Sequence, residues 1–287
     1  HGEYAANMAA HETDLLISLG ARFDDRVTGR LDEFASKAKV IHIDIDPTSI
    51  AKLVVADYPI VGDLKLTVEA MIEDSENYEI NDFSNWVELL KDYREKEPLR
   101  YIDTDDLIKP QWPIQRVGKI LGDNAIISTD VGQHQMWTAQ FFPFSHPRQW
   151  ITSGGLGTMG FGLPAALGAA RAFKGTNRVV VNFTGDGSIL MNIQERMTCS
   201  EYELPVINIV LNNNYLGMVR QWQTMFYENR LAETDLSAQP KFKMLVEAFG
   251  GLGYRVTTKE EFDAALKDAV EQRKPAMIEV VVARNEE

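Results

Sequence analysis

Short apolar runs alternate with helical segments along most of this 287-residue chain. In its second half we expect strands at Ala125–Thr129, Arg178–Phe183, Pro205–Leu211 and Ala276–Val282, and a helix at Gly160–Phe173. Strands that are mostly apolar on both faces are typical of a parallel sheet covered by helices on both sides. The sequence therefore predicts an α/β fold with a doubly wound parallel sheet, in which ligands bind beyond the carboxyl ends of the strands.

The first part of the chain repeats this alternation on a smaller scale. Strands are expected at Leu15–Gly20, Val40–Pro47 and Tyr58–Asp63, followed by a helix at Leu64–Met71. An amphipathic helix at Trp86–Tyr93 follows, with acidic and polar segments on either side. We therefore divide the chain into part of a Rossmann-like domain (residues 1–75), an acidic helical linker (76–108) and a C-terminal domain (109–287).

Composition excludes several classes of protein. Lys and Arg total 29 against 42 Asp and Glu, which gives a net charge of −13. Neither nucleic acid nor an anionic membrane is expected as the main partner of such an acidic chain. No apolar run approaches the roughly 20 residues that span a bilayer, so a soluble protein is expected. The single cysteine, Cys199, forms no intrachain disulfide and is expected to be inert packing.

Two loops that follow neighbouring strands carry the strongest functional signal. Gly185-Asp186-Gly187-Ser188 ends one strand and opens a helix, whose apolar face is expected to hold Ile189, Ile193 and Met197. Asn212-Asn213-Asn214-Tyr215 follows the next strand. A carboxylate, an amide oxygen and a main-chain carbonyl are ligands that suit Mg²⁺, and free N–H groups near Ser188 suit an anion. The pair predicts a site for a metal diphosphate; the alternative is a simple turn beside a surface loop.

Gly-Asp-Gly followed at this spacing by Asn-Asn resembles the signature of thiamine-diphosphate enzymes. Three further segments narrow the resemblance: Asp130–Trp137, Thr152–Gly160 and Leu216–Trp222 are similar to the catalytic subunit of the acetohydroxyacid synthase (acetolactate synthase) family. The resemblance covers almost the whole chain. The family's chain is much longer, so we expect this sequence to be its back half, cut at both ends; a small processed or tag-cleaved protein is the alternative.

The resemblance also implies a set of site residues. Thiamine diphosphate would contact Gln133, His134, Gly157, Met159, Asp186, Gly187, Ser188, Asn213, Gly217 and Met218. Mg²⁺ would be held by Asp186, Asn213 and the main-chain carbonyl of Tyr215. Met218 and Trp222 would face the substrate. FAD, generally structural in this family, would lie along His1, Gly20, Arg22, Asp24, Asp44 and Asp63 in the partial central domain.

The implied reaction decarboxylates pyruvate and joins the remaining two carbons to a second pyruvate or to 2-oxobutanoate, in branched-chain amino acid biosynthesis. A homodimer or tetramer, a possible regulatory small subunit, and a cytoplasmic (bacterial) or organellar (eukaryotic) location are implied as well. In the family an activating glutamate comes from the N-terminal domain of a neighbouring subunit. No catalytic residue of this chain matches it, so residues 1–287 alone are expected to be inactive.

Alternatives remain open for the function and for single residues. The protein could be another thiamine-diphosphate decarboxylase or carboligase, or a cofactor-binding module without turnover. Met159 and Met218 could fill core space, and His134 could be a structural histidine. Surface salt bridges explain Arg22 and Asp24 equally well.

Overall fold

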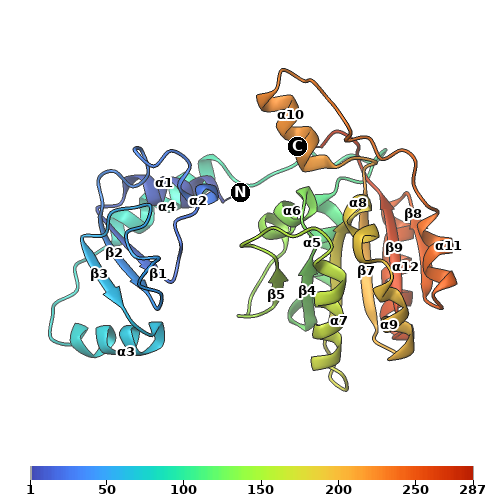
Figure 1. Cartoon of the computed structure of the whole chain (residues 1–287), viewed down its shortest axis with the longest axis horizontal. Coiled ribbons are helices and arrows are strands. Elements are labelled where there is room, and N and C mark those ends of the chain that lie inside the picture. The colour runs from blue at the N-terminus through green and yellow to red at the C-terminus, as the bar shows by residue number, and fades with distance from the viewer. Residues whose placement is uncertain (1, 287) are drawn as a thin grey trace. The chain divides into compact units, whose positions relative to one another are not determined.

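The computed structural model describes residues 2–286 and divides into two compact units, residues 1–100 and 101–287 (Figure 1). In the first unit, β1 (Leu15–Leu19), β2 (Lys39–Asp44) and β3 (Tyr58–Val61) form a parallel sheet in that order. All three strands were predicted. Leu15, Ile17 and Leu19, which share one face of β1, are 43–50% exposed. The expected helical cover on both faces is therefore incomplete in this sheet.

The helices of the first unit include one within the predicted linker. They are α1 (Tyr4–Glu12), α2 (Asp25–Thr28), α3 (Leu64–Ser75) and α4 (Ser84–Lys96). The ring of Tyr93 on α4 lies 5.8 Å from that of Tyr4 on α1, edge to face, and Arg94 pairs with Glu3 at 3.2 Å. The helix in the linker thus packs on α1, and the contacts divide the chain after Arg100. The domain boundaries at 75 and 108 remain predictions.

The second unit contains a six-stranded sheet in which every pair of neighbours is parallel, in the order β5-β4-β6-β7-β9-β8. Its strands are β4 (Ala125–Thr129), β5 (Trp150–Thr152), β6 (Val179–Gly185), β7 (Val206–Asn212), β8 (Leu252–Val256) and β9 (Ala276–Val281). The four central strands are those that the sequence predicts. β5 and β8 are missing from the prediction because they are edge strands, one very short and the other partly polar.

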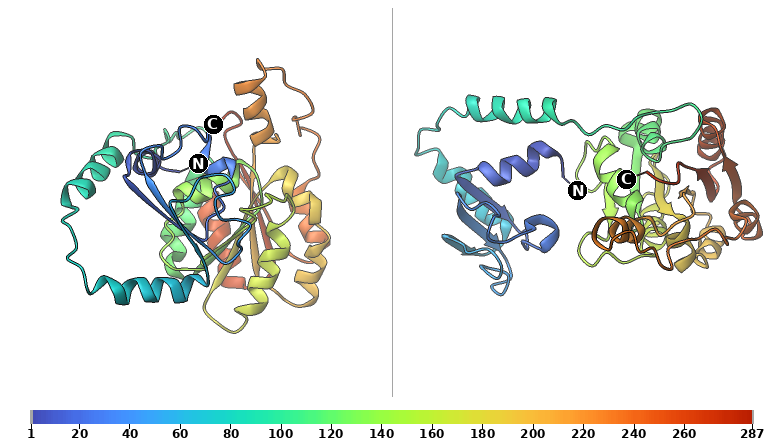
Figure 2. Two further views of the ribbon diagram at one scale, coloured as in Figure 1. Left: turned by 60° about the vertical axis from the view of Figure 1, so that its left-hand side comes forward. Right: turned by 90° about the horizontal axis from the view of Figure 1, so that it is seen from above.

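Helices cover both faces of this sheet, as expected (Figures 1 and 2). Residues of α5 (Gln111–Leu121), α6 (Gln133–Phe141) and α12 (Lys259–Gln272) pack in the core on one face. Residues of α7 (Gly162–Ala172), α9 (Glu195–Glu201) and α11 (Phe242–Ala248) pack in the core on the other. The doubly wound fold is therefore confirmed. No helix in residues 2–286 is long and apolar enough to cross a membrane.

The segment after Gly185 differs from the single helix that the sequence predicts. It consists of α8 (Asp186–Ile189), a 3₁₀ turn (Leu190–Asn192) and α9. The break changes the helical phase: Ile189 is 1% exposed, but Met197 is 55% exposed. The predicted place of Met197 on the apolar face is therefore wrong. Cys199 is buried in the core as expected, and burial raises the pKa of its thiol to about 11, which keeps it protonated.

The strand order places a switch point between β4 and β6. From β4 the chain proceeds to β5 on one side, and from β6 it proceeds to β7 on the other. The loops after two adjacent strands therefore diverge and leave a crevice at the carboxyl edge of the sheet, where ligands bind in folds of this type. The short helices α8 and α10 (Gly217–Phe226) lie at this edge, as Figure 1 shows.

Two alanine substitutions test which residues of the helical segment after Gly185 face the core. Ile189→Ala should lower the free energy of unfolding by about 2–5 kcal/mol, because it leaves a cavity in the core. Met197→Ala should change it by about 0.5 kcal/mol or less, because that side chain is largely exposed. Urea unfolding followed by circular dichroism measures both. Equal losses of unfolding free energy in the two variants would contradict the break in the helix.

Candidate functional site

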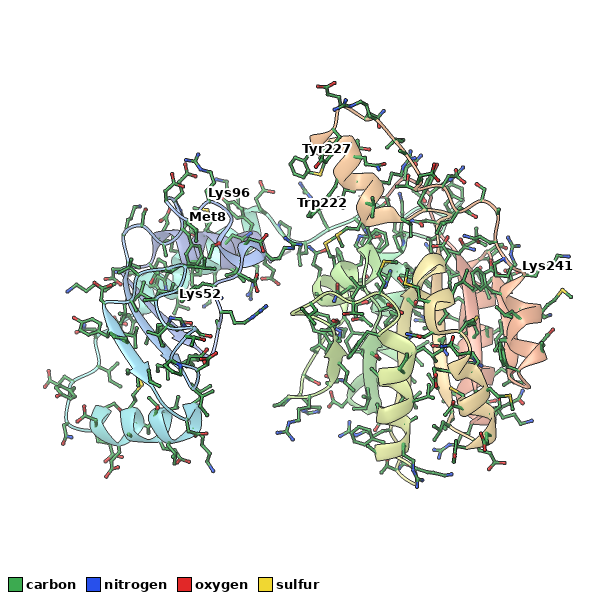
Figure 3. The ribbon with its side chains drawn as sticks, in the orientation of Figure 1. Met8, Lys52, Lys96, Trp222, Tyr227 and Lys241 are labelled. Atoms are coloured by element: carbon green, nitrogen blue, oxygen red, sulfur yellow. The ribbon has the colours of Figure 1, made fainter. Side chains whose placement is uncertain are left out.

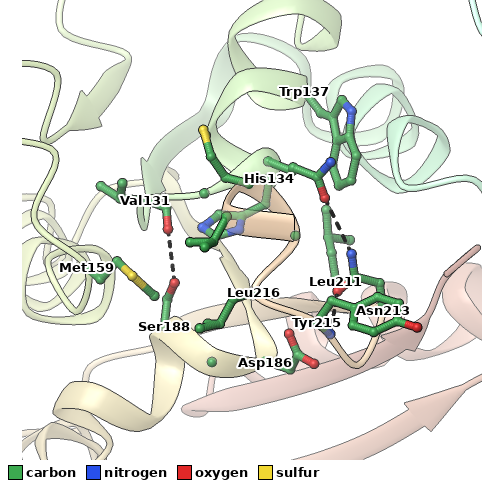
Figure 4. Close-up of a pocket in the computed structure, with 17 residues that line it drawn as sticks. Val131, His134, Trp137, Met159, Asp186, Ser188, Leu211, Asn213, Tyr215 and Leu216 are labelled. Atoms are coloured by element: carbon green, nitrogen blue, oxygen red, sulfur yellow. Dashed lines mark hydrogen bonds between the residues drawn. The ribbon is translucent and has the colours of Figure 1, made fainter. Parts of the chain in front are cut away.

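A pocket lies at the switch point and is lined by the loops after β4, β6 and β7 (Figure 4). It brings together all the predicted thiamine diphosphate contacts except Gly157, and Tyr215 lies with them. The residues of this pocket that the sequence predicts are Gln133, His134, Met159, Asp186, Gly187, Ser188, Asn213, Tyr215, Gly217 and Met218. Segments far apart in the chain therefore meet at one place.

Parallel pairing of β6 with β7 places the two signature loops side by side. Gly185 is in register with Leu211 at the ends of the strands. Asp186 and Asn213 follow them and are 2% and 7% exposed, and both line the pocket. The Asn213 Oδ1 accepts the N–H of Tyr215 at 3.1 Å, which holds this turn closed. The two turns thus place a carboxylate and an amide at one edge of the sheet, with Tyr215 beside them in the pocket lining.

His134 carries a buried nitrogen without a partner. Its side chain lies in the pocket, and among the described residues its Nε2 has no hydrogen-bond partner (Figure 4). Burial lowers the pKa of the imidazole to about 3, so the ring is neutral at pH 7. A Cβ at Gly185 would lie 3.0 Å from its Nδ1, so the glycine leaves room for the ring. Such a group calls for an explanation, and because this one lies in a pocket, a bound ligand would supply its partner.

Gln133 is packed as tightly as its neighbour. A Cβ at Gly217, where α10 begins, would lie 1.9 Å from its Oε1, so a larger residue there would displace the Gln133 side chain. The Asn213 Nδ2 also points to this oxygen at 3.5 Å. The glutamine therefore connects the loop after β4 with the turn after β7.

Ser188 and Asp130 connect the loops on the other side of the pocket. The Ser188 hydroxyl donates to the carbonyl of Val131 at 3.1 Å. Asp130 is fully buried and accepts the N–H of Gly160 at 2.7 Å and that of Val131 at 3.0 Å. Asp130 therefore braces the loop after β4 against the segment before α7, a role that its place in the Asp130–Trp137 segment does not predict.

Asp186 is a buried carboxyl group with an altered pKa. Burial raises this pKa to about 6, against hydrogen bonds from Gln239 and from backbone N–H groups, which lower it. Gln239 was missed by sequence reasoning, because it stands in an irregular segment with no motif around it. Among the described residues no cluster of three or more His, Cys, Asp and Glu side chains could hold a metal. A cation here would have to use mixed oxygen ligands.

The ring of Tyr215 is clamped by two arginines. The guanidinium carbons of Arg220 and Arg284 lie 4.0 Å and 4.2 Å from its centre. Arg284 also pairs with Asp235 at 2.7 Å. These contacts attach the turn after β7 to α10 and to the segment after β9.

Gly157 and Trp222 lie outside the pocket lining. Gly157 is exposed, with a φ of +66° that favours glycine. Trp222 is 43% exposed on α10, in edge-to-face contact with Phe226 at 6.2 Å (Figure 3). Met159 and Met218 line the pocket and are only partly buried.

The predicted flavin residues are in the first unit. Gly20, Asp44 and Asp63 stand at the carboxyl ends of β1, β2 and β3, at one edge of that sheet. Arg22 pairs with Asp24 at 3.3 Å on the surface, as the salt-bridge alternative requires. Asp24 and Asp63 also cap α2 and α3. His1 lies outside the described residues, and a flavin role for this set stays a prediction.

The pKa of Asp186 predicts a pH dependence. The folded value of about 6 lies above the ordinary 3.8, so the unfolded chain loses this proton first as pH rises. Without metal, the fold should therefore lose stability between about pH 4 and 6. Asp186→Asn removes the ionisation and should stabilise the metal-free chain above pH 6 by up to about 3 kcal/mol, with convergence near pH 4.

Urea unfolding in EDTA at pH 7.5 and pH 4.5 measures this gain. Asp123→Asn is the control, since this exposed carboxylate near the amino end of β4 has a pKa lowered by its hydrogen bond from Ser145. The control should show no gain at pH 7.5. A loss of stability in Asp186→Asn at pH 7.5, or the same gain at both pH values, would contradict the account.

Comparison with known proteins agrees with this geometry. Residues 130–280 match the thiamine pyrophosphate enzyme C-terminal TPP binding domain, and residues 1–71 match the central domain of the same enzymes. The chain is 46% identical over 276 residues to the acetolactate synthase isozyme 3 large subunit of Escherichia coli (strain K12), covering 95% of this chain and 48% of that protein.

Relatives from two other organisms match at similar identity and coverage. The chain is 44% identical to the probable acetolactate synthase large subunit of Methanocaldococcus jannaschii, over 98% of this chain and 48% of that protein. It is 43% identical to acetolactate synthase 1, chloroplastic, of Nicotiana tabacum, over 100% of this chain and 44% of that protein. The chain thus spans about half the length of the curated relatives it matches. Its C-terminal match covers more than half of its length, and the chain belongs to the thiamine pyrophosphate enzyme family.

Proposed function

We propose that this chain carries the diphosphate and metal side of the cofactor site in an acetolactate synthase. The whole protein would decarboxylate pyruvate and join the two-carbon unit to pyruvate or 2-oxobutanoate. Relatives at 43–46% identity that bear this name support the proposal. This chain spans about half of the length of those relatives. The activity and the substrates are therefore proposed for the whole protein.

One observation carries the assignment: a pocket at the switch point holds a neutral, buried His134 whose Nε2 is unpartnered among the described residues. A neutral imidazole can donate one N–H to a phosphate oxygen without the cost of burying a cation. The Gln133 amide has a second N–H beside the one that it donates to the Glu286 carbonyl at 3.3 Å, and the Ser188 hydroxyl would reach a phosphate by giving up its bond to the Val131 carbonyl. These groups fit a diphosphate.

The metal donors fit a hard cation. Asp186, Asn213 and the carbonyl of Tyr215 would hold Mg²⁺, which prefers oxygen ligands and retains phosphate and water oxygens. Asp186 supplies the negative charge that compensates for the cation's lost hydration. Burial opposes ionisation of this carboxyl when no metal is present, so the cation and the carboxylate support each other.

The remaining residues would shape the reaction space. When bound, thiamine diphosphate supplies a carbanion at its C2 atom and an electron sink for loss of CO₂. Met159 would pack beneath the cofactor, and the carbonyl of Gly157 would accept a hydrogen bond from its amino group. Met218 and Trp222 on α10 would contact the second 2-oxo acid and exclude water.

The proposal includes further partners. FAD would bind along Gly20, Arg22, Asp24, Asp44 and Asp63, at the carboxyl edge of the first sheet. The whole protein would form a homodimer or tetramer and could take a regulatory small subunit. We infer a cytoplasmic location in a bacterium and an organellar one in a eukaryote; one relative's name includes the word chloroplastic.

Removal of the Asp186 carboxylate tests the metal site. The wild-type chain should bind thiamine diphosphate in isothermal titration calorimetry only when Mg²⁺ is present. Asp186→Ala should weaken this binding by at least about 100-fold, because no nearby group replaces the lost charge. Asp123→Ala, at the opposite edge of the sheet, is the matched control and should bind as the wild type does. Unchanged affinity in Asp186→Ala would show that the site is elsewhere.

Trp222 tests the proposed acceptor contact. Trp222→Leu in the whole protein should change the ratio of 2-aceto-2-hydroxybutanoate to 2-acetolactate by about tenfold when pyruvate and 2-oxobutanoate compete. Met225→Leu, on α10 and 60% exposed, should leave the ratio within about twofold. Equal ratios in the wild type and Trp222→Leu would remove this role. Aldehyde without any acetohydroxy acid would indicate a simple decarboxylase instead.

A further inference from the structure

The Asp186 carboxylate stands at one end of a chain of buried and partly buried hydrogen bonds. Its Oδ2 accepts a hydrogen bond from the Gln239 side-chain amide. The Gln239 Oε1 in turn accepts from Asn212 Nδ2 at 2.8 Å, and the same nitrogen donates to Glu279 Oε1 at 2.9 Å. Asn212 and Glu279 are 4% and 5% exposed. The chain thus joins the loop after β6 to the end of β7 and to the middle of β9.

The direction of every hydrogen bond in this chain is fixed by its two ends. The Glu279 and Asp186 side chains are the acceptors at the two ends. Asn212 must therefore turn its NH₂ group to Glu279, and its Oδ1 accepts the N–H of Asn214 at 3.1 Å. The second N–H of Asn212 then goes to the Gln239 Oε1, which leaves the Gln239 NH₂ for Asp186. A flip of the Gln239 amide would break two contacts, and a flip of the Asn212 amide would break three.

The segment that carries Gln239 is also attached to the metal turn. The N–H of Leu216 donates to the carbonyl of Thr234 at 2.9 Å, and the N–H of Leu236 donates to that of Asn214 at 2.8 Å. One irregular segment therefore contacts the turn after β7 through its backbone and Asp186 through a side chain. It is placed to fix the distance between the two proposed halves of the metal site.

We propose that Gln239, oriented by Asn212 and Glu279, is a positioning residue that holds the Asp186 carboxylate in place for a divalent cation. This inference rests on the proposed function and deepens it. The bond from the Gln239 amide to Oδ2 would fix the orientation in which the carboxylate binds the cation. Hydrogen-bonded partners of this kind orient metal ligands, and their loss typically weakens metal binding by about 10–100-fold.

A cation titration of two glutamine variants tests the proposal. Gln239→Met keeps an unbranched side chain of similar length but removes the donor. Gln223→Met is the matched control, because Gln223 holds the same irregular segment through the backbone of Ala232, at 3.0 and 3.1 Å, without contact to Asp186. Each chain, in excess thiamine diphosphate, is titrated with Mn²⁺, and bound ion is measured as lost EPR signal against a protein-free titration.

Gln239→Met should raise the dissociation constant of Mn²⁺ by about 10–100-fold, and Gln223→Met by less than about twofold. Urea unfolding establishes that both variants are folded. Should Gln239→Met fail to fold, Gln239→Asn, which keeps the amide but shortens its reach by one methylene, takes its place with the same expected direction. Equal effects of the two glutamine variants would overturn the inference and leave the proposed function standing. No Mn²⁺ binding by the wild-type chain would overturn both.

Discussion

The parallel pairing of β6 with β7 is the constraint on which the rest of the site depends. Its register ends with Gly185 opposite Leu211, so the chain leaves both strands at the same edge and at the same level. Asp186 and Asn213 meet for that reason alone, although an entire helical segment and a strand separate them in sequence. The adjacent β4 sends its loop the other way and opens the crevice that His134 and Gln133 enter.

Burial gives this edge its chemistry. At 2% exposure Asp186 is costly as an anion without a counter-ion, and His134 is kept neutral for the same reason. A carboxylate that gains a cation and an imidazole that gains a phosphate oxygen are both relieved of an unfavourable state. The empty site therefore lowers the stability of the fold, and bound ligands restore it. Functional sites commonly reduce stability in this way.

The sequence predicted those parts of the structure that depend on local pattern. Central strands such as β6 and β7 are buried on both faces and read as apolar runs, and the glycine and amide loops follow them directly. Edge strands such as β8 lack that pattern. Met197 was misplaced because helical spacing was extended across a 3₁₀ turn. Gln239 could not be found at all, since its contact with Asp186 is made by the fold across an irregular segment.

The most direct test of the account is a crystal structure of the chain with thiamine diphosphate and Mn²⁺, with the metal located by anomalous scattering. The account predicts one peak roughly 2.0–2.3 Å from oxygens of Asp186, Asn213 and Tyr215, with a phosphate oxygen beside His134 Nε2. A metal peak bound away from these two turns, or a cofactor that leaves His134 without a partner, would contradict it.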